Sequence, residues 1–467
     1  MAHVRILRHY IHTPYLLLAS EEAVAIAFAA SAGYYTLHGE LPALDSHLPF
    51  TIALVLTLTF FMAAMGVYEA RLREGYSGML LRTAVAIFLL GTSGMAVLSY
   101  LLPSLSAAPG VLLFAATEAF VLVAIVRWLI AHLVDDDLLK RRVLVYGAGA
   151  RASKVASRMR RRSDRRAFVL VGFLQTIQGE DAVSEHGIVP VTYPENELLD
   201  YCKRSKVDEM VVASDERRAA SESLDELMAC RLSGIDVCEI QDFIEREASK
   251  IDVDLLQKSW LLCSDGFVTG GLRAVIKRVF DILAAFGLLF VLWPVMLLTA
   301  IAIRLFDGIR RPARYRQTRV GLNGTVFEVI KFRTMPKNAE DAGAVWADYK
   351  DKRATRLGRI LRSTRIDELP QLFNVLRGEM SMVGPRPERP VFVEQLDPHL
   401  PYYSQRHRIK PGITGWAQLC YPYGASVEDA KEKLQYDLYY VKNHSILLDM
   451  IIWLKTVEVV LVGEGAR

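Results

Sequence analysis

The sequence contains few cysteines, and their spacing excludes the common zinc-binding patterns. Five cysteines occur in 467 residues, and none of them forms a C-x-x-C pair or has the spacing of a zinc site. We therefore expect reduced thiols in contact with the cytoplasm. The sequence also lacks internal repeats and low-complexity tracts, which excludes a repeat array.

An excess of charge of either sign is absent as well. The 56 lysines and arginines are nearly balanced by 52 aspartates and glutamates, so the formal net charge is only +4. This total gives no reason to expect a nucleic-acid partner, and we expect none. The local distribution is more informative, because eight basic residues lie between Arg151 and Arg166 and six lie between Arg304 and Arg319.

Long apolar runs, in contrast, are abundant. Hydrophobic residues make up 52% of the chain and the mean hydropathy is +0.21, which is high for a soluble protein. Runs near 14–37, 49–69, 79–101 and 109–133 each approach the ~20 residues needed to cross a bilayer. We predict a four-helix transmembrane bundle in residues 1–136, without a cleaved signal peptide, because the apolar pattern repeats.

Basic residues between these runs predict how the bundle lies in the membrane. Lysines and arginines precede the first run, follow the fourth run and occur in the second loop, whereas the first and third loops have none. The positive-inside rule then places both ends of the bundle in the cytoplasm. Glu21, Glu22 and Glu118 fall within the runs, where they either mark a functional site in the membrane or pair inside the bundle.

Residues 137–264 form the second predicted domain, a Rossmann-like α/β domain. Short apolar runs alternate with helical stretches, which is typical of a parallel sheet. The G-x-G-x-x-A turn at Gly147–Ala152 has the shape of a dinucleotide-binding turn, but the second strand, which ends at Gly172–Gln175, lacks the acidic residue that would bind a ribose. Two interpretations stay open: a nucleotide site, or a tight strand-to-helix turn in a degenerate domain.

A fifth apolar segment, residues 281–304, lies in the third predicted domain, residues 265–467. It contains 22 consecutive uncharged residues, which is enough to cross a bilayer. Pro294 lies near its middle and removes a helix hydrogen bond, and basic residues flank both ends. We predict a re-entrant helix that enters the membrane, bends at Pro294 and returns to the cytoplasm. An ordinary fifth span is the alternative.

The most informative stretch of the chain contains two adjacent carboxylates, Asp367 and Glu368. Neighbouring residues on a helix point about 100° apart, so the pair suits two different roles, such as a nucleophile and a metal ligand. Five arginines, spaced every three residues, lead into it: Arg353, Arg356, Arg359, Arg362 and Arg365. Arginines bind phosphate oxygens through a bidentate fork, so the stretch predicts phosphate chemistry. An internal ion-pair network is the plainer alternative.

Further motifs surround the pair. They are Lys331-Phe-Arg333-Thr-Met335 after an apolar strand, the turn Ser381–Pro387, and the Pro/Gly turn Lys410–Gln418. Trp416 in the last motif is also compatible with a core position. Near the C-terminus, Ile446–Val462 is apolar with three charges, which suits a helix in the membrane interface or, alternatively, a buried core helix.

Together and in this order, the motifs resemble the bacterial sugar transferase family, the monotopic polyprenyl-phosphate glycosyl-1-phosphate transferases. The resemblance covers residues 271–464 and includes K-F-R-T-M, D-E-L-P-Q-L-F-N, S-M-V-G-P-R-P, K-P-G-I-T-G-W-A-Q and the tract Y-D-L-Y-Y-V-K-N. The preceding bundle and α/β domain are similar to those of long-form members, which initiate exopolysaccharide, capsule or O-antigen synthesis. The family often has Ser-Pro where this chain has Trp293-Pro294, so the bend of the membrane helix does not follow from the family alone.

The resemblance implies a reaction and residues that carry it. A nucleotide diphosphate-sugar, such as a UDP-sugar, enters from the cytoplasm, and Asp367 attacks the sugar-linked phosphate and releases UMP. The phosphate of undecaprenyl phosphate then attacks the phosphosugar-enzyme and forms the polyprenyl-diphospho-sugar. Mg²⁺ is the implied cofactor, bound by Glu368. The implied phosphate- and substrate-binding residues are Lys331, Arg333, Arg362, Arg386 and Pro387.

The resemblance also implies a multi-pass protein of the bacterial inner membrane, with a cytoplasmic monotopic α/β catalytic domain and a homodimeric state. Two other classes fit the residues less well. A membrane-anchored NAD-dependent sugar-nucleotide dehydratase would need a Tyr-x-x-x-Lys pair, which the sequence lacks. A non-catalytic membrane scaffold would have no need of the Asp-Glu pair and its arginines.

Overall fold

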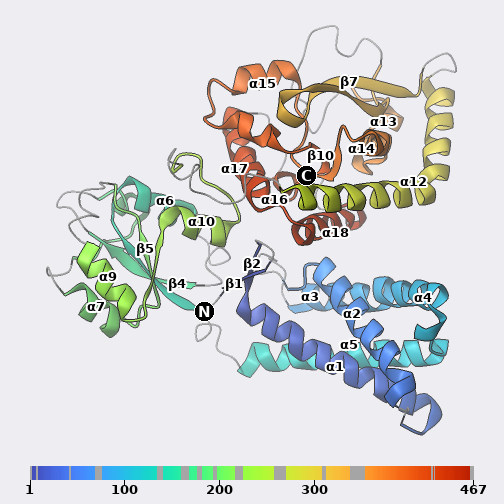
Figure 1. Ribbon diagram of the computed structural model, residues 1–467, viewed down its shortest axis with the longest axis horizontal. Helices are drawn as coiled ribbons and strands as arrows, with labels where there is room; N and C mark the ends of the chain where they lie inside the picture. Colours follow the sequence, from blue (N-terminus) through green and yellow to red (C-terminus); the bar gives the residue numbers. More distant parts are fainter. Residues whose placement is uncertain are drawn as a thin grey trace. The chain divides into compact units, whose positions relative to one another are not determined.

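The structure, a computed structural model, contains two compact units. Apart from a few residues near the N-terminus, the first unit ends at Ala248 and the second begins at Ser249 (Figure 1). The predicted domain boundaries at 136 and 264 stay predictions. The residues that the structure describes are 3–6, 9–41, 44–68, 76–133, 140–158, 168–175, 181–192, 197–215, 224–256, 270–307, 312–336, 353–421, 424 and 426–462.

The first unit begins with a set of long apolar helices, which are blue to cyan in Figure 1. Four segments are long and apolar enough to cross a membrane, and they lie close to the four predicted runs. The number of true spans and their orientation stay predictions. Two short paired strands, β1 (His3–Ile6) and β2 (His9–His12), precede the helices, which are α1 (Thr13–His38), α2 (Leu44–Ala64), α3 (Tyr76–Ala84), the π-helical η1 (Val85–Gly91), α4 (Thr92–Leu101) and α5 (Pro109–Leu133).

Close packing of α1 against α5 depends on a glycine. A Cβ atom at Gly33 would lie 2.5 Å from the backbone nitrogen of Ala115, so any larger residue would push the two helices apart. Small residues at such contacts allow membrane helices to approach each other closely. Buried apolar side chains fill the rest of this helical core: Ile26, Leu54, Leu58, Met62, Ile87, Met95 and Val123.

Two carboxylates that the sequence placed within the runs are paired inside the bundle. Glu22 is fully buried and accepts hydrogen bonds from Arg127 (2.9 Å) and from the Tyr68 hydroxyl (2.6 Å). Glu118 accepts a hydrogen bond from Thr36 (2.9 Å). A buried charge needs such a partner, so the bundle-interior alternative describes these two residues.

The predicted parallel sheet is confirmed in the second half of the first unit (Figure 1). Its strands run in the order β4-β3-β5-β6, all parallel, at the apolar runs that the sequence indicated. The strands are β3 (Arg141–Tyr146), β4 (Phe168–Leu174), β5 (Glu209–Val212) and β6 (Asp236–Glu239). The helices beside them are α6 (Ala150–Arg158), α7 (Leu198–Arg204), α9 (Leu224–Leu232) and α10 (Ile240–Ala248).

The glycine-rich turn after β3 binds a carboxylate of the protein itself. Gly147 has a φ of +125°, and a Cβ atom there would lie 2.8 Å from the Ala213 carbonyl oxygen. Asp215 accepts hydrogen bonds from the backbone N–H groups of Ala150 (2.6 Å) and Arg151 (2.9 Å). These are the N–H groups that face a pyrophosphate in a dinucleotide site. Their occupation by Asp215 favours the tight-turn interpretation of the motif.

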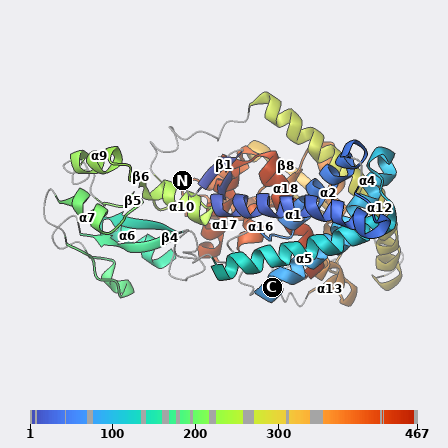
Figure 2. The same cartoon turned by 90° about the horizontal axis from the view of Figure 1, so that it is seen from below.

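The second unit combines two small sheets with the long helix α12 (Gly271–Asp307) and several shorter helices, some of which are labelled in Figure 2. An antiparallel hairpin consists of β7 (Arg314–Val320) and β8 (Val326–Phe332), and a parallel pair consists of β9 (Ser381–Val383) and β10 (Gly412–Thr414). The shorter helices are α13 (Arg356–Ser363), the 3₁₀ turn η6 (Ile366–Glu368), α14 (Gln371–Arg377), α15 (Pro390–Leu396), the 3₁₀ helix η7 (Tyr403–Arg408), α16 (Trp416–Cys420), α17 (Val427–Asn443) and α18 (Ile446–Val462).

Helix α12 bends part-way along its length (Figure 1), and each of its arms packs on a separate hydrophobic cluster of the second unit. Pro294 lies inside the helix, where the missing N–H group favours a kink. On the arm before the bend, Lys277 forms an ion pair with Asp449 (2.7 Å). On the arm after it, Ile303 is buried in a cluster with Phe332 and other apolar residues. The two ends of α12 therefore contact one unit.

Between these two anchors α12 exposes a continuous apolar surface. It is the fifth helix that is long and apolar enough to enter a membrane. Its large exposed side chains near the bend are Phe286, Phe290, Val291, Trp293, Leu297 and Leu298. The predicted helix break at Pro294 agrees with the bent helix, and the re-entrant path remains a proposal.

Two ambiguous elements of the sequence belong to the core of the second unit. Trp416 is 4% exposed, and its indole N–H donates to the Ser249 carbonyl (2.9 Å). Leu448 and Ile452 on α18 are fully buried in the same core. The described side chains of α18 therefore agree with the core-helix alternative, and the interfacial placement stays a prediction.

Candidate active site

The two carboxylates lie in the short turn η6, and local packing fixes where this turn sits. The preceding helix α13 starts at Thr355, whose side chain caps it by accepting from the Gly358 N–H group (2.9 Å). A Cβ atom at Gly358 would lie 2.1 Å from the Thr334 carbonyl oxygen, so α13 rests directly on the chain that leaves β8. Arg362, one turn further along α13, donates to the Thr334 hydroxyl (3.1 Å). The end of β8 and the turn η6 are thereby held together.

Glu368 is surrounded by cations. Its Oε1 atom accepts hydrogen bonds from Lys331 Nζ (3.0 Å) and Arg386 Nη2 (3.1 Å), and Arg365 Nη1 lies 3.6 Å from Oε2. Burial alone would raise the pKa of Glu368, but the three cations outweigh it and hold this pKa well below its usual range. Glu368 is therefore ionised at neutral pH and fully engaged.

Asp367 differs from Glu368 both in its contacts and in the direction of its pKa shift. Its side chain is 8% exposed, and it makes no hydrogen bond or ion pair with any other residue that the structure describes. Burial, together with the charge of Glu368, raises the pKa of Asp367 to about 6, although Lys331, Arg362 and Arg386 act to lower it. Asp367 is thus a carboxylate with free oxygens in a cationic pocket.

The structure gathers most of the predicted phosphate-binding residues around the pair. Lys331, Arg362 and Arg386 all act on the pKa of Asp367, which places them close to it. Arg333 lies two residues after Lys331 on an extended segment, and hence on the same face. Its Nη1 atom is buried without a hydrogen-bond partner among the described residues, which is the state expected of a group that awaits an anion. The roles themselves stay predictions.

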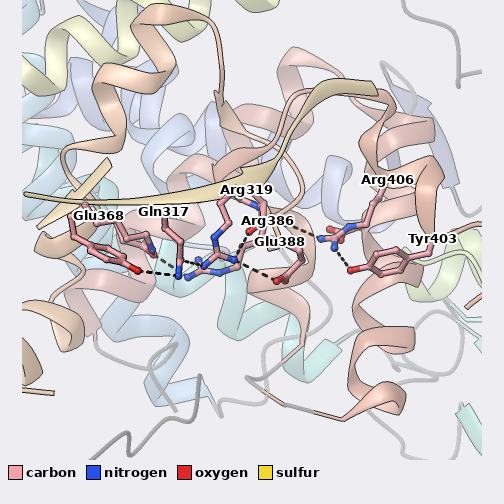
Figure 3. Close-up of polar contacts among 11 residues, drawn as sticks. Gln317, Arg319, Glu368, Arg386, Glu388, Tyr403 and Arg406 are labelled. Carbon is pink, nitrogen blue, oxygen red and sulfur yellow. Dashed lines mark hydrogen bonds and ion pairs between the residues drawn. The ribbon is translucent and has the colours of Figure 1, made fainter. Parts of the chain in front are cut away.

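Pro387 is placed by its backbone and not by a contact of its ring. Its carbonyl oxygen accepts a hydrogen bond from Arg319 Nη1 (3.1 Å), which belongs to β7. Arg319 also donates to Gln317 Oε1 (2.6 Å) on the same strand (Figure 3). The sequence analysis missed this pair, although residues 314–320 alternate between exposed and half-buried positions and the half-buried ones are polar.

A second missed residue lies behind the Arg386 loop. Arg406 on η7 is 5% exposed and donates to the Tyr403 hydroxyl (2.8 Å) and to the Arg386 carbonyl (3.0 Å) (Figure 3). It also forms an ion pair with Asp437 (2.7 Å) on α17. Because Arg386 and Asp437 are 20 and 31 positions away in sequence from Arg406, no local pattern indicates these two contacts.

The donor set limits how a metal could bind. No group of three or more His, Cys, Asp or Glu side chains suited to a metal occurs in the part of the chain that the structure describes. Mg²⁺ is commonly held by one or two carboxylates together with substrate phosphates. Asp367 and Glu368 fit this mode, provided that a bound diphosphate draws Lys331 and Arg386 away from Glu368.

Comparison with known proteins decides the family. Residues 272–463 match the model described as bacterial sugar transferase, and residues 63–219 match one described as a CoA-binding domain. A UDP-glucose:undecaprenyl-phosphate glucose-1-phosphate transferase of Caulobacter vibrioides is 41% identical over 192 residues, which are 41% of this chain and 71% of the relative. The chain belongs to the bacterial sugar transferase family.

Similarity to other sugar transferases extends beyond the matched segment. A UDP-N-acetylgalactosamine-undecaprenyl-phosphate N-acetylgalactosaminephosphotransferase of Aeromonas hydrophila is 42% identical over 241 residues, which cover 52% of this chain and 56% of the relative. An undecaprenyl-phosphate glucose phosphotransferase of Komagataeibacter xylinus is 34% identical over 326 residues, which cover 68% of this chain and 59% of the relative. The chain thus spans somewhat more than half the length of these two relatives. All the candidate site residues of this sugar transferase lie within the family match at 272–463.

Proposed function

We propose that this sugar transferase moves a sugar-1-phosphate from a UDP-sugar to undecaprenyl phosphate and releases UMP. The contrast within the carboxylate pair carries the proposal: Glu368 is bonded to three cations, whereas Asp367 has no partner among the described residues. A nucleophile needs free oxygens, and its neighbours need positive charge for the phosphates. The names of the relatives, which contain both substrates, support the same donor and acceptor.

The reaction proceeds by two displacements at one phosphorus atom. A carboxylate oxygen of ionised Asp367 forms a bond to the sugar-linked phosphorus, the anhydride bond breaks, and UMP leaves with the electron pair. A phosphate oxygen of undecaprenyl phosphate then attacks the same phosphorus, and the Asp367 carboxylate leaves. Lys331, Arg362 and Arg386 bind the phosphate oxygens and offset their charge, which is the main electrostatic task in phosphoryl transfer.

Membrane placement of the site follows from the bent helix α12. We propose that α12 is re-entrant, since both of its arms pack on one unit and its apolar middle is exposed. This path keeps Asp367 at the cytoplasmic headgroup level of the inner membrane, where a UDP-sugar and a lipid phosphate can meet. The initiation of a surface polysaccharide and a homodimeric state are further expectations from the family.

The test is release of UMP by the purified full chain in lipid nanodiscs. A panel of UDP-sugars is supplied with undecaprenyl phosphate, and UMP is followed over time. One UDP-sugar should give UMP and a lipid-linked sugar diphosphate, and omission of the lipid should leave a single-turnover burst of UMP. Release of UDP, or of no nucleotide with any sugar, would reject the proposed reaction.

The reaction should weaken in acid, because Asp367 must be ionised to attack. Its pKa is raised to about 6 by burial and by Glu368, so kcat/KM should fall about tenfold per pH unit below about pH 6. Initial rates between pH 4.5 and 8 measure this, and a flat profile down to pH 5 contradicts it.

Removal of divalent metal should stop the reaction. Glu368 would hold Mg²⁺ together with the substrate phosphates, and the ion would supply positive charge for the displaced nucleotide phosphate. EDTA should lower UMP release to background, and added Mg²⁺ or Mn²⁺ should restore it. Unchanged rates in EDTA would remove the metal from the proposed site.

Both ends of α12 should be accessible from the cytoplasm. Single cysteines replacing Val275 and Arg316, introduced into a chain without its native cysteines, should react with a membrane-impermeant maleimide only in inverted vesicles. In the same experiment, Pro294→Leu should straighten the helix and lower the rate of transfer. Labelling of the two positions from opposite faces would mean that α12 is an ordinary span.

A further inference from the structure

The loop that carries Arg386 is held at four successive carbonyl groups. Each carbonyl from residue 385 to residue 388 accepts a hydrogen bond from a different residue outside the loop. In that order the donors are Gly412 N (3.0 Å), Arg406 Nη2 (3.0 Å), Arg319 Nη1 (3.1 Å) and Val320 N (2.9 Å). Two of the four donors are thus arginine side chains, and one of these holds the carbonyl of Arg386 itself.

Restraint of this loop backbone matters because the Arg386 side chain binds Glu368, the neighbour of Asp367. The Arg386 Nη2 atom reaches Glu368 Oε1 at 3.1 Å, and the side chain of Arg386 is 32% exposed. A free arginine side chain has many rotamers, and their loss opposes each contact that it makes. Pro385 and Pro387, which flank it, restrict the backbone on both sides. Fixing the Cα atom of Arg386 therefore reduces the cost of directing its guanidinium to a phosphate.

The residue behind the loop is itself held by a buried partner. Arg406 is 5% exposed and Asp437 is 2% exposed, and their ion pair measures 2.7 Å. The Tyr403 hydroxyl accepts from the other terminal nitrogen of Arg406 (2.8 Å). A buried guanidinium keeps one orientation only while its donors are paired. Asp437 thus sets the direction in which Arg406 meets the Arg386 carbonyl.

We propose that the buried Arg406–Asp437 pair is a positioning device that fixes Arg386 for binding the phosphates of the substrate. The proposal rests on the proposed function and deepens it. Neither member of the pair touches the reacting atoms, so both act through Arg386. The proposal also gives a role to Asp437, a residue of the tract Tyr436–Asn443. The displacement mechanism itself does not use this tract.

A double-mutant cycle separates positioning from plain stabilisation. Asp437→Asn keeps the size and an acceptor oxygen but removes the charge, and it should lower kcat/KM for the active UDP-sugar about tenfold. In an Arg386→Ala background the same change should cost less than about twofold, because the residue through which it acts is gone. An equal cost in both backgrounds would overturn the proposal.

A milder variant provides a second measure. Tyr403→Phe removes the hydroxyl that accepts a hydrogen bond from Arg406, and it should lower kcat/KM in the same direction as Asp437→Asn but by less. In the Arg386→Ala background this loss should disappear, and the variant serves if Asp437→Asn does not fold.

Hydrogen exchange tests the pair without any substrate. In the full chain in nanodiscs, Asp437→Asn should increase exchange in a peptide that covers residues 384–388. The matched control Tyr421→Phe removes a tyrosine hydrogen bond to Asp429, which involves none of the four loop carbonyls, and should leave that peptide unchanged. Unchanged exchange in Asp437→Asn would refute the positioning role. If exchange increases in the variant but the wild-type protein transfers no sugar phosphate, only the proposed reaction is refuted.

Discussion

Replacing Asp367 with asparagine should abolish transfer and at the same time make the second unit more stable. Turnover should fall by at least about 10³-fold, because an amide cannot form the phosphosugar bond. The covalent adduct with the sugar phosphate should disappear as well. UMP release and intact-protein mass measure these two losses.

The gain in stability follows from the direction of the pKa shift. The pKa of Asp367 is raised in the folded protein, so its favourable contribution exists at acid pH and is lost as the pH rises through about 6. At pH 7.5 the ionised, unpaired carboxylate costs roughly 1–3 kcal/mol, and asparagine removes this cost. The melting temperature should therefore rise at pH 7.5 and change little at pH 4.

A matched control is Asp397→Asn, at an exposed position after α15. It should leave both the rate and the melting temperature unchanged. A lower melting temperature for Asp367→Asn at pH 7.5 would mean that the ionised carboxylate stabilises the fold, and the assignment of Asp367 as a free nucleophile would then fail.

Replacing Glu368 with glutamine should reduce transfer by roughly 10²-fold or more and should, in contrast, destabilise the second unit. The lowered pKa of Glu368 shows that its ionised form favours the fold above about pH 4. A neutral amide leaves Lys331, Arg365 and Arg386 without a counter-charge, which costs about 2–4 kcal/mol. Thermal unfolding at pH 7.5 measures the loss, and the exposed Glu394→Gln is the control. Equal melting temperatures for the two variants would contradict the ion-pair description.

The candidate site can be located in the sequence, because the relevant signals are local. The apolar runs, the alternation of strands and helices and the adjacent carboxylates are all readable within short windows. The five arginines that precede the carboxylate pair illustrate the limit of such signals. Helix geometry allows only some of them to face Asp367 and Glu368. In the fold Arg362 and Arg365 do so, whereas Arg356 and Arg359 are exposed.

The family resemblance implies roles for the two carboxylates, but the residues alone do not distinguish them, because their contacts come from distant segments. Nothing local distinguishes Asp367 from Glu368 as the engaged carboxylate. The difference arises because Lys331, 37 positions before Glu368, reaches it from the hairpin. The support of Arg386 by Arg406 is hidden for the same reason. Likewise, the apolar pattern of α18 fits an interface or a core, and contacts with distant segments, such as the ion pair of Asp449 with Lys277, connect its described side chains to the core.

The two anchors of α12 have a consequence for the lipids that this enzyme tolerates. A helix that spans a bilayer must match its hydrocarbon thickness, and a mismatch costs energy per ångström. In the proposed re-entrant path, α12 is fixed at both ends to one unit and meets only one leaflet. Depth of the site is then set by protein contacts, and lengthening the acyl chains of the surrounding lipids leaves it unchanged. Any sensitivity to bilayer thickness would come from the helices of the first unit.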